Sequence, residues 1–137
     1  MAEISEVMLF CEKYYSKKKF LHALRVAAFA LDKAEHDDRI DSKDAFIVGL
    51  CHDLIEDTDC SQDQLQMLIG IDLFSSVCIL TKSDTESYQD YIIDVIYSND
   101  PLAILVKGAD MKDHMSQLDT LTDKLKEKYL PVLHYFL

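Results

Sequence analysis

Glycine and proline are scarce along the whole chain, and this scarcity constrains the fold more than any other feature. Only three glycines and two prolines occur in 137 residues. Both residue types interrupt regular helices, and between them apolar residues recur at three- and four-residue steps. One such run contains Leu21, Leu24, Ala28 and Leu31. The pattern predicts an all-α fold, a bundle of about seven or eight helices.

Capping patterns indicate where several of these helices begin. Asp41-Ser42, Ser61 with Gln64, and Asp100-Pro101 are typical of helix N-termini. The predicted helices cover Ile4–Tyr15, Phe20–Glu35, Lys43–Glu56, Gln62–Ile69, Leu73–Thr81, Thr85–Tyr97, Pro101–Met115, and a last helix from Thr120 or Thr122 to Phe136. No repeat, low-complexity tract or linker divides the chain. We therefore expect residues 1–137 to form a single domain.

The composition argues against several kinds of partner and location. Fourteen basic and 25 acidic residues give a net charge of −11, which repels a nucleic-acid backbone. No apolar run approaches the length of a membrane span, and residues 1–10 lack the features of a signal peptide. The cysteines are widely spread, as is typical of small core residues in a reduced protein: Cys11, Cys51, Cys60 and Cys78. We expect a cytoplasmic protein that binds neither nucleic acid nor membrane.

The stretch Gly49 to Thr58 places several polar side chains inside a strongly apolar pattern. If the helix over Lys43–Glu56 is continuous, four of them share one of its faces: His52, Asp53, Glu56 and Asp57. Burying three carboxylates and an imidazole together is costly unless a positive charge neutralises them, and a divalent metal is the simplest such charge. The alternative is an ordinary surface His-Asp pair, which is the commoner role of such a pair on a helix.

Two further residues are candidate partners in a metal site. His22 lies inside an amphipathic helical pattern, where a histidine at the edge of the core is the usual alternative. Asp110 lies in the apolar run from Ala103 to Met111, where an acid needs a specific reason to occur.

The order of these residues resembles that of the HD-domain metal phosphohydrolases, and in particular the branch of Rel/Spo-type alarmone hydrolases and their small relatives. His52 to Thr58 is similar to the branch's H-D-x-x-E-D-T, and Val106 to Asp110 to its V-K-x-A-D. Further matching stretches are His22 to Ala27, Leu80 to Lys82, Tyr88 to Ile92 and Asn99 to Ala103. The resemblance extends over residues 19–115 and implies a single-domain HD-type helical bundle.

The resemblance also implies a role for each matched residue. His22, His52, Asp53 and Asp110 would bind one divalent metal, with Mn²⁺ as the expected ion. Glu56 and Asp57 would orient and deprotonate the attacking water. Lys107 would contact a phosphate, although a snorkelling surface lysine is an equally good interpretation.

Two departures from the family concern the nucleotide side of the pocket. Alarmone hydrolases carry an Arg-Lys-Gly-x-Pro-Tyr type segment before the first histidine, where this chain has Lys17, Lys18 and Lys19. A solvated turn is the alternative interpretation of these lysines. Family members have asparagine four residues after the last metal aspartate, where this chain has His114. Lys19 and His114 are accordingly candidate substrate-binding residues, and the departures concern substrate choice.

The leading hypothesis is therefore a metal-dependent phosphohydrolase acting on a small phosphorylated nucleotide, in its most specific form a guanosine 3',5'-bis(diphosphate) (ppGpp) 3'-pyrophosphohydrolase. The alternatives are an HD-type 5'-nucleotidase or other nucleotide phosphatase, and a non-catalytic metal- or nucleotide-binding HD module. A plain helical interaction protein would bind no metal. The apolar segment Ser116–Leu137 would close the core or form a dimer face, so both a monomer and a homodimer stay open.

Overall fold

A computed structural model describes residues 2–117 and 123–136, and every regular element in these ranges is helical. The elements are α1 (Ile4–Tyr14), α2 (Lys17–Ala34), α3 (Ser42–Cys51), α4 (Leu54–Asp57), α5 (Gln62–Ile69), α6 (Ile71–Ile79), α7 (Tyr88–Tyr97), α8 (Pro101–Ser116), α9 (Asp123–Tyr129) and the 3-10 helix η1 (Leu130–Phe136). The predicted all-α fold is confirmed. Nine α-helices in the described ranges slightly exceed the expected number, because α4 is a separate single turn.

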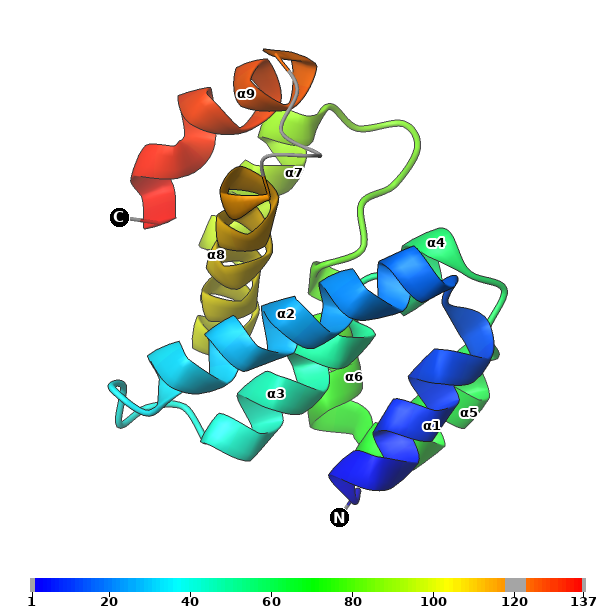
Figure 1. The fold of residues 1–137 in the computed structure, drawn as a ribbon. Helices are drawn as coiled ribbons and strands as arrows, with labels where there is room; N and C mark the ends of the chain where they lie inside the picture. The colour runs from blue at the N-terminus through cyan, green and yellow to red at the C-terminus, as the bar shows by residue number, and fades with distance from the viewer. Residues whose placement is uncertain (1, 118–122, 137) are drawn as a thin grey trace.

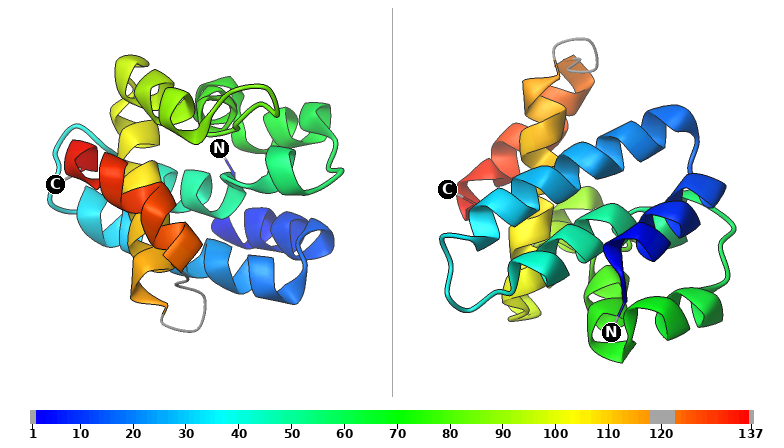
Figure 2. Two further views of the ribbon diagram at one scale, coloured as in Figure 1. Left: turned by 90° about the horizontal axis from the view of Figure 1, so that it is seen from above. Right: turned by 60° about the horizontal axis from the view of Figure 1, so that its bottom comes forward.

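Three helices cross at the centre of the molecule. α2 packs against α3 and α8, and α3 also packs against α8 (Figure 1). Gly49 permits the closest of these contacts, because a Cβ at this position would lie 2.7 Å from the Cα of Ala27. The views from other directions show the remaining helices arranged around this centre, with α9 and η1 beside α8 (Figure 2). The residues that follow α3 are thereby held close to α2 and α8.

The predicted capping residues begin the helices as expected. The Asp41 side chain accepts a hydrogen bond from Asp44 N, the Ser61 hydroxyl from Gln64 N, and Asp100 from Leu102 N and Ala103 N. A further cap at Ser16 starts α2 at Lys17, three residues before the predicted start. Residues 17–19 therefore form the first turn of a helix, and their side chains are exposed as the interpretation as a solvated turn expects.

The prediction of one continuous helix over Lys43–Glu56 is also wrong. α3 ends at Cys51, and Asp53 adopts φ −104° and ψ 1°, outside the helical region. An uninterrupted helix would pair the Asp53 N–H with the Gly49 carbonyl. Here the Gly49 carbonyl accepts from His52 Nδ1 at 2.6 Å, and the Asp53 N–H donates to the Tyr15 hydroxyl at 3.2 Å. Because of this break, His52 and Asp53 do not lie on one continuous helix face with Glu56 and Asp57.

The C-terminal region differs from its prediction as well. The predicted start at Thr120 or Thr122 lies outside the described residues, and Tyr129 ends α9 before η1 begins. Buried Tyr129 and Val132 pack into the core, so this segment closes the core as one of the two expectations proposed.

Cys78 is exposed, so its assignment to the core is wrong, whereas the other three cysteines are buried. No helix of the described residues is long and apolar enough to cross a membrane.

Candidate metal centre

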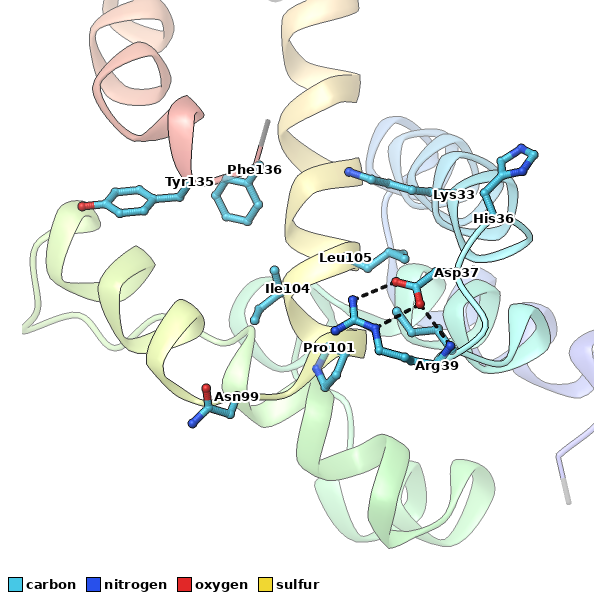
Figure 3. Close-up of a pocket in the computed structure, with 11 residues that line it drawn as sticks. Lys33, His36, Asp37, Arg39, Asn99, Pro101, Ile104, Leu105, Tyr135 and Phe136 are labelled. Carbon is cyan, nitrogen blue, oxygen red and sulfur yellow. Dashed lines mark hydrogen bonds and ion pairs between the residues drawn. The ribbon is translucent and has the colours of Figure 1, made fainter.

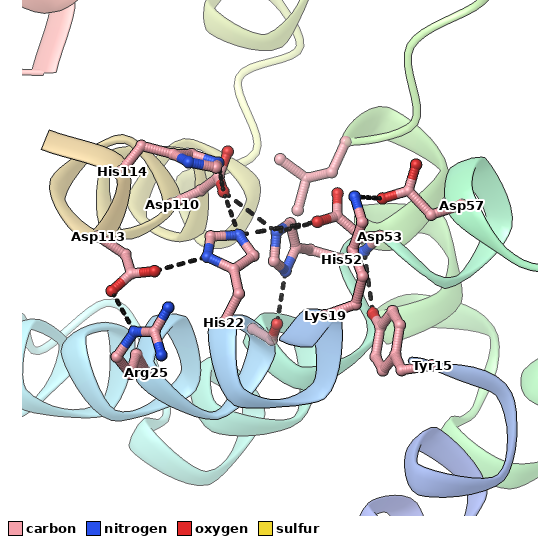
Figure 4. A network of polar contacts seen from close by, with 12 residues as sticks. Tyr15, Lys19, His22, Arg25, His52, Asp53, Asp57, Asp110, Asp113 and His114 are labelled. Carbon is pink, nitrogen blue, oxygen red and sulfur yellow. Dashed lines mark hydrogen bonds and ion pairs between the residues drawn. The ribbon is translucent and has the colours of Figure 1, made fainter. Parts of the chain in front are cut away.

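The four predicted metal ligands meet in space although they come from three parts of the sequence. His22 comes from α2, His52 and Asp53 from the break after α3, and Asp110 from α8 (Figure 4). One ligand atom of each lies within 4.8 Å of the ligand atoms of all the others. The expected cluster therefore forms, and it forms because α3 breaks where it does.

The His52 ring is set up to present one unprotonated nitrogen to this cluster. Its Nδ1 donates to the Gly49 carbonyl at 2.6 Å, which leaves Nε2 with the lone pair in the neutral ring. Nε2 is buried, has no hydrogen-bond partner among the described residues, and lies 3.0 Å from Asp53 Oδ2 and 3.3 Å from Asp110 Oδ1. A buried acceptor next to two carboxylate oxygens fits a cation between them.

The His22 ring is oriented in the same way by a carboxylate. Its Nδ1 lies 2.6 Å from Asp113 Oδ2, and Arg25 Nε donates to the other oxygen of Asp113 at 2.7 Å. His22 Nε2 faces the cluster, 2.9 Å from Asp110 Oδ1. A carboxylate behind a ligating histidine is the usual second layer of a metal site. Sequence reasoning missed Asp113, although its spacing of three from Asp110 on one helix was a usable signal.

Burial and charge oppose each other at these groups. Burial lowers the pKa of His52, but the negative charges of Asp53 and Asp110 outweigh it and keep this pKa well above its ordinary value. Burial raises the pKa of Asp110, but Lys107 and the neighbouring imidazoles hold it well below its ordinary value. The carboxylates are therefore ionised, and the cluster attracts positive charge, either protons on the imidazoles or a metal.

A cavity of about 210 Å³ lies beside the cluster, and it collects the other predicted site residues. Its lining includes Asp53 and Asp110 of the cluster and the remaining predicted site residues: Glu56, Asp57, Lys19, Lys107 and His114. The structure adds six lining residues that sequence reasoning did not select: Leu80, Lys82, Tyr88, Tyr91, Lys128 and Tyr129. The sequence did not indicate the three tyrosines as site residues, because tyrosines at helical spacing are typical of ordinary core residues.

The two acids of the predicted catalytic pair have different environments. Asp57 Oδ2 accepts a hydrogen bond from Lys19 Nζ at 2.9 Å, so this carboxylate is already paired with a cation. Among the described residues, Glu56 Oε1 accepts a hydrogen bond from the backbone N–H of Lys82 alone, at 2.8 Å. Partial burial raises the pKa of Glu56 above its ordinary value, against the effect of that hydrogen bond. Burial therefore makes the Glu56 carboxylate more basic than an ordinary glutamate.

Lys107 is not a snorkelling surface residue, and that interpretation is wrong. Its side chain is buried, and Nζ donates to Asp110 Oδ2 at 2.7 Å. The ammonium also lies 5.4 Å and 5.1 Å from the ring centres of Tyr88 and Tyr91. Burial lowers the pKa of Lys107, but the Asp110 charge outweighs it, so the lysine is charged. This ammonium fixes the Asp110 carboxylate on the side opposite the imidazoles.

A second and larger cavity, of about 500 Å³, lies at the N-terminal half of α8 (Figure 3). Pro101, Ile104 and Leu105 of α8 form part of its wall, and Phe136 of η1 closes another side. Its acid, Asp37, is bound by Arg39 at 2.9 Å in an exposed pair. The cavity has a histidine, His36, but the described residues around it form no group of imidazoles and carboxylates comparable to that at Asp110.

The fold is similar to that of a solved structure described as a metazoan ortholog of SpoT that hydrolyses ppGpp and plays a role in starvation responses. The TM-score is 0.73 at 20% sequence identity, and the match covers 99% of this chain and 84% of that chain. No family model matches the chain, and no curated protein matches it by sequence. The similarity confirms the fold predicted from the sequence, an all-α helical bundle, which this chain shares with that structure.

Proposed function

We propose that this chain is a metal-dependent phosphohydrolase that acts on a small phosphorylated nucleotide. The observation that carries the proposal is the cluster itself. Two imidazoles that turn Nε2 toward the same point and two ionised carboxylates converge beside a cavity lined by acids and lysines. The fold supports the same conclusion, because a structure with this fold belongs to a protein that hydrolyses ppGpp.

The residues present fit a divalent metal. His22, His52, Asp53 and Asp110 would hold it, and Mn²⁺ is the expected ion because a mixed imidazole and carboxylate set suits a borderline metal. When bound, such an ion lowers the pKa of a water molecule and withdraws charge from phosphoryl oxygens. Asp113 and the Gly49 carbonyl hold the two histidines in the tautomer that binding requires.

Glu56 acts as the general base in this proposal. Its carboxylate lines the cavity and is not paired with a cation, and its raised pKa favours taking a proton from the attacking water. Asp57 has another task, because its bond to Lys19 holds that ammonium at the cavity. Lys19, Lys107 and His114 line the same cavity and would contact the phosphate groups of the substrate.

The most specific form of the proposal is removal of the 3'-pyrophosphate of ppGpp. The fold similarity supports this substrate. A specific observation favours a second candidate, a nucleotide phosphatase. The cavity of about 210 Å³ is smaller than the roughly 300 Å³ at which drug-sized ligand pockets begin. A substrate that inserts only one phosphate would fit this cavity more readily than one that inserts a pyrophosphate.

Product analysis tests the proposal and separates the two candidates. Mn²⁺-loaded protein is incubated with ppGpp and with nucleoside mono- and triphosphates, and phosphate and pyrophosphate are measured separately. Pyrophosphate from ppGpp supports the alarmone hydrolase, and phosphate from a nucleoside monophosphate supports the phosphatase. Bound metal without turnover on any member would contradict catalysis and favour a binding module. A cytoplasmic location and the choice between monomer and homodimer stay predictions.

A further inference from the structure

His114 stands one helical turn after Asp110 on α8, so both side chains project from the same side of that helix. Its ring is held between two others. The ring centres of His114 and Tyr129 lie 5.3 Å apart with the planes stacked at 19°, and the His22 ring lies 4.5 Å away at 35°. This packing fixes the orientation of the imidazole and leaves its Nε2 edge beside the cluster (Figure 4).

Three imidazoles point Nε2 at the same oxygen. Asp110 Oδ1 lies 2.9 Å from His22 Nε2, 3.3 Å from His52 Nε2 and 3.4 Å from His114 Nε2. The other carboxylate oxygen, Oδ2, is occupied by Lys107. His114 approaches the four-residue cluster from the side of Asp110, and this carboxylate is its polar partner among the described residues.

This arrangement needs positive charge among the nitrogens, either protons on the imidazoles or a metal. Neutral His22 and His52 carry their protons on Nδ1, so their Nε2 lone pairs face a carboxylate oxygen, which is repulsive. A metal at this point removes the repulsion and binds every lone pair that faces it. His114 presents the same atom to the same Asp110 oxygen at nearly the same distance as His52, and it would reach a metal beside that oxygen.

We infer that His114 is an additional ligand of the metal, bound through Nε2. The inference rests on the proposed metal site and extends it to three imidazoles and two carboxylates. The family resemblance relates the replacement of asparagine by His114 to the choice of substrate. The geometry relates it to the metal instead. A site richer in nitrogen favours Co²⁺, Ni²⁺ or Zn²⁺ over Mn²⁺ more strongly than one with two imidazoles.

The test is the binding of Co²⁺ and Mn²⁺ by the metal-free protein. Affinities are measured by competition with a chelator for the wild type, for His114→Asn and for His36→Asn, which makes the same substitution at a histidine in the second cavity. The expected result is a loss of Co²⁺ affinity of about tenfold or more in His114→Asn, with a smaller loss for Mn²⁺. The visible absorption spectrum of bound Co²⁺ should also change in His114→Asn and stay unchanged in His36→Asn.

Each other outcome has a distinct meaning. Equal Co²⁺ affinity and an identical Co²⁺ spectrum in His114→Asn and wild type would overturn the inference and leave the four-residue metal site standing. Failure of the wild type to bind either ion would instead overturn the proposed metal centre. Circular dichroism of the metal-free variants shows whether they fold, and His114→Gln replaces His114→Asn if that variant does not. The same comparison of affinity and spectrum then applies to His114→Gln.

Discussion

Two of the cavities beside α8, the one next to the metal ligands and the larger one, differ in a way that size does not predict. The larger cavity, about 500 Å³, has Pro101, Ile104 and Leu105 in its wall, and its acid Asp37 is bound by Arg39. The smaller one, about 210 Å³, adjoins ionised carboxylates and imidazoles that converge on one another. Polar groups that converge and lack a full set of partners therefore indicate where chemistry takes place. The volume of a cavity indicates only that the packing around it is imperfect.

The same helices build both cavities, which makes matched substitutions possible. α2 supplies His22 to the cluster and Lys33 to the larger cavity, and α8 supplies Asp110 to the cluster and Leu105 to the larger cavity. A change in one region that leaves the other unaffected therefore separates chemistry from general damage to the fold.

The largest contrast is expected between the acids of the two cavities. Asp53→Ala should lower metal affinity by about 100-fold or more and remove turnover, because it deletes a ligand from a buried cluster. Asp37→Ala should leave metal binding and turnover unchanged, because it removes only an exposed ion pair. Both are measured by calorimetric metal titration and by product release. Equal effects of the two substitutions would abolish the distinction between the cavities.

Glu56→Gln separates binding from catalysis within the smaller cavity. Glutamine can still accept the Lys82 N–H, so the local structure and the metal affinity should persist. Turnover should fall by about 10²- to 10⁴-fold because the general base is lost. Metal content and initial rates are measured on the same preparation. A fully active Glu56→Gln enzyme would exclude Glu56 as the base, and Asp57→Asn would then be tested in that role.

Metal affinity should depend on pH at the cluster. The carboxylates keep the pKa of His22 and His52 above the ordinary value of about 6.5, so the metal-free imidazoles hold protons that a metal must displace. Lowering the pH through this raised pKa should weaken Mn²⁺ binding by up to about tenfold per pH unit for each displaced proton. Calorimetry between about pH 6 and about pH 8 measures affinity and proton release.

The stability of the metal-free chain should change with pH in the opposite sense. A raised pKa in the folded state contributes stability that is fully present below the unfolded value of about 6.5 and is lost as the pH rises through the folded value. The Tm of metal-free protein should therefore fall as the pH rises above neutrality. The Tm of Asp53→Ala should fall less, because that variant lacks the charge that raises the pKa of His52. A metal-free Tm that rises over this range would contradict the assigned protonation.

The smallest expected effects come from two glycines. Gly49→Ala should destabilise the fold by about 1–3 kcal/mol, because the new Cβ would lie 2.7 Å from the backbone of Ala27 and separate α2 from α3. Gly108→Ala places its Cβ at an ordinary 3.4 Å from the Phe136 side chain near the larger cavity, so it should be neutral or slightly stabilising. Denaturant unfolding of both variants measures the difference. An equally stable Gly49→Ala would show that the close contact of α2 and α3 is not required.

The sequence allowed the helical fold and the four clustered residues to be predicted, because helical periodicity and the His-Asp motif are local patterns. It did not reveal the break at His52–Asp53. That break depends on Tyr15, whose hydroxyl bonds Leu50 O and Asp53 N from a position 35 and 38 residues away. The pairing of Asp113 with His22 and the burial of Lys107 are also long-range consequences of how α2, α7 and α8 pack. Spacing along one helix places Asp113 near Asp110 but does not show that Asp113 contacts His22.

The most direct test of the account is the amount of Mn²⁺ bound per chain, measured by calorimetric titration of metal-free wild type and Asp110→Asn. The account predicts about one tightly bound ion in the wild type and none in the variant, since Asp110 is the carboxylate on which the imidazoles converge. Absence of binding by the folded wild type, or unchanged binding by Asp110→Asn, would contradict the metal centre.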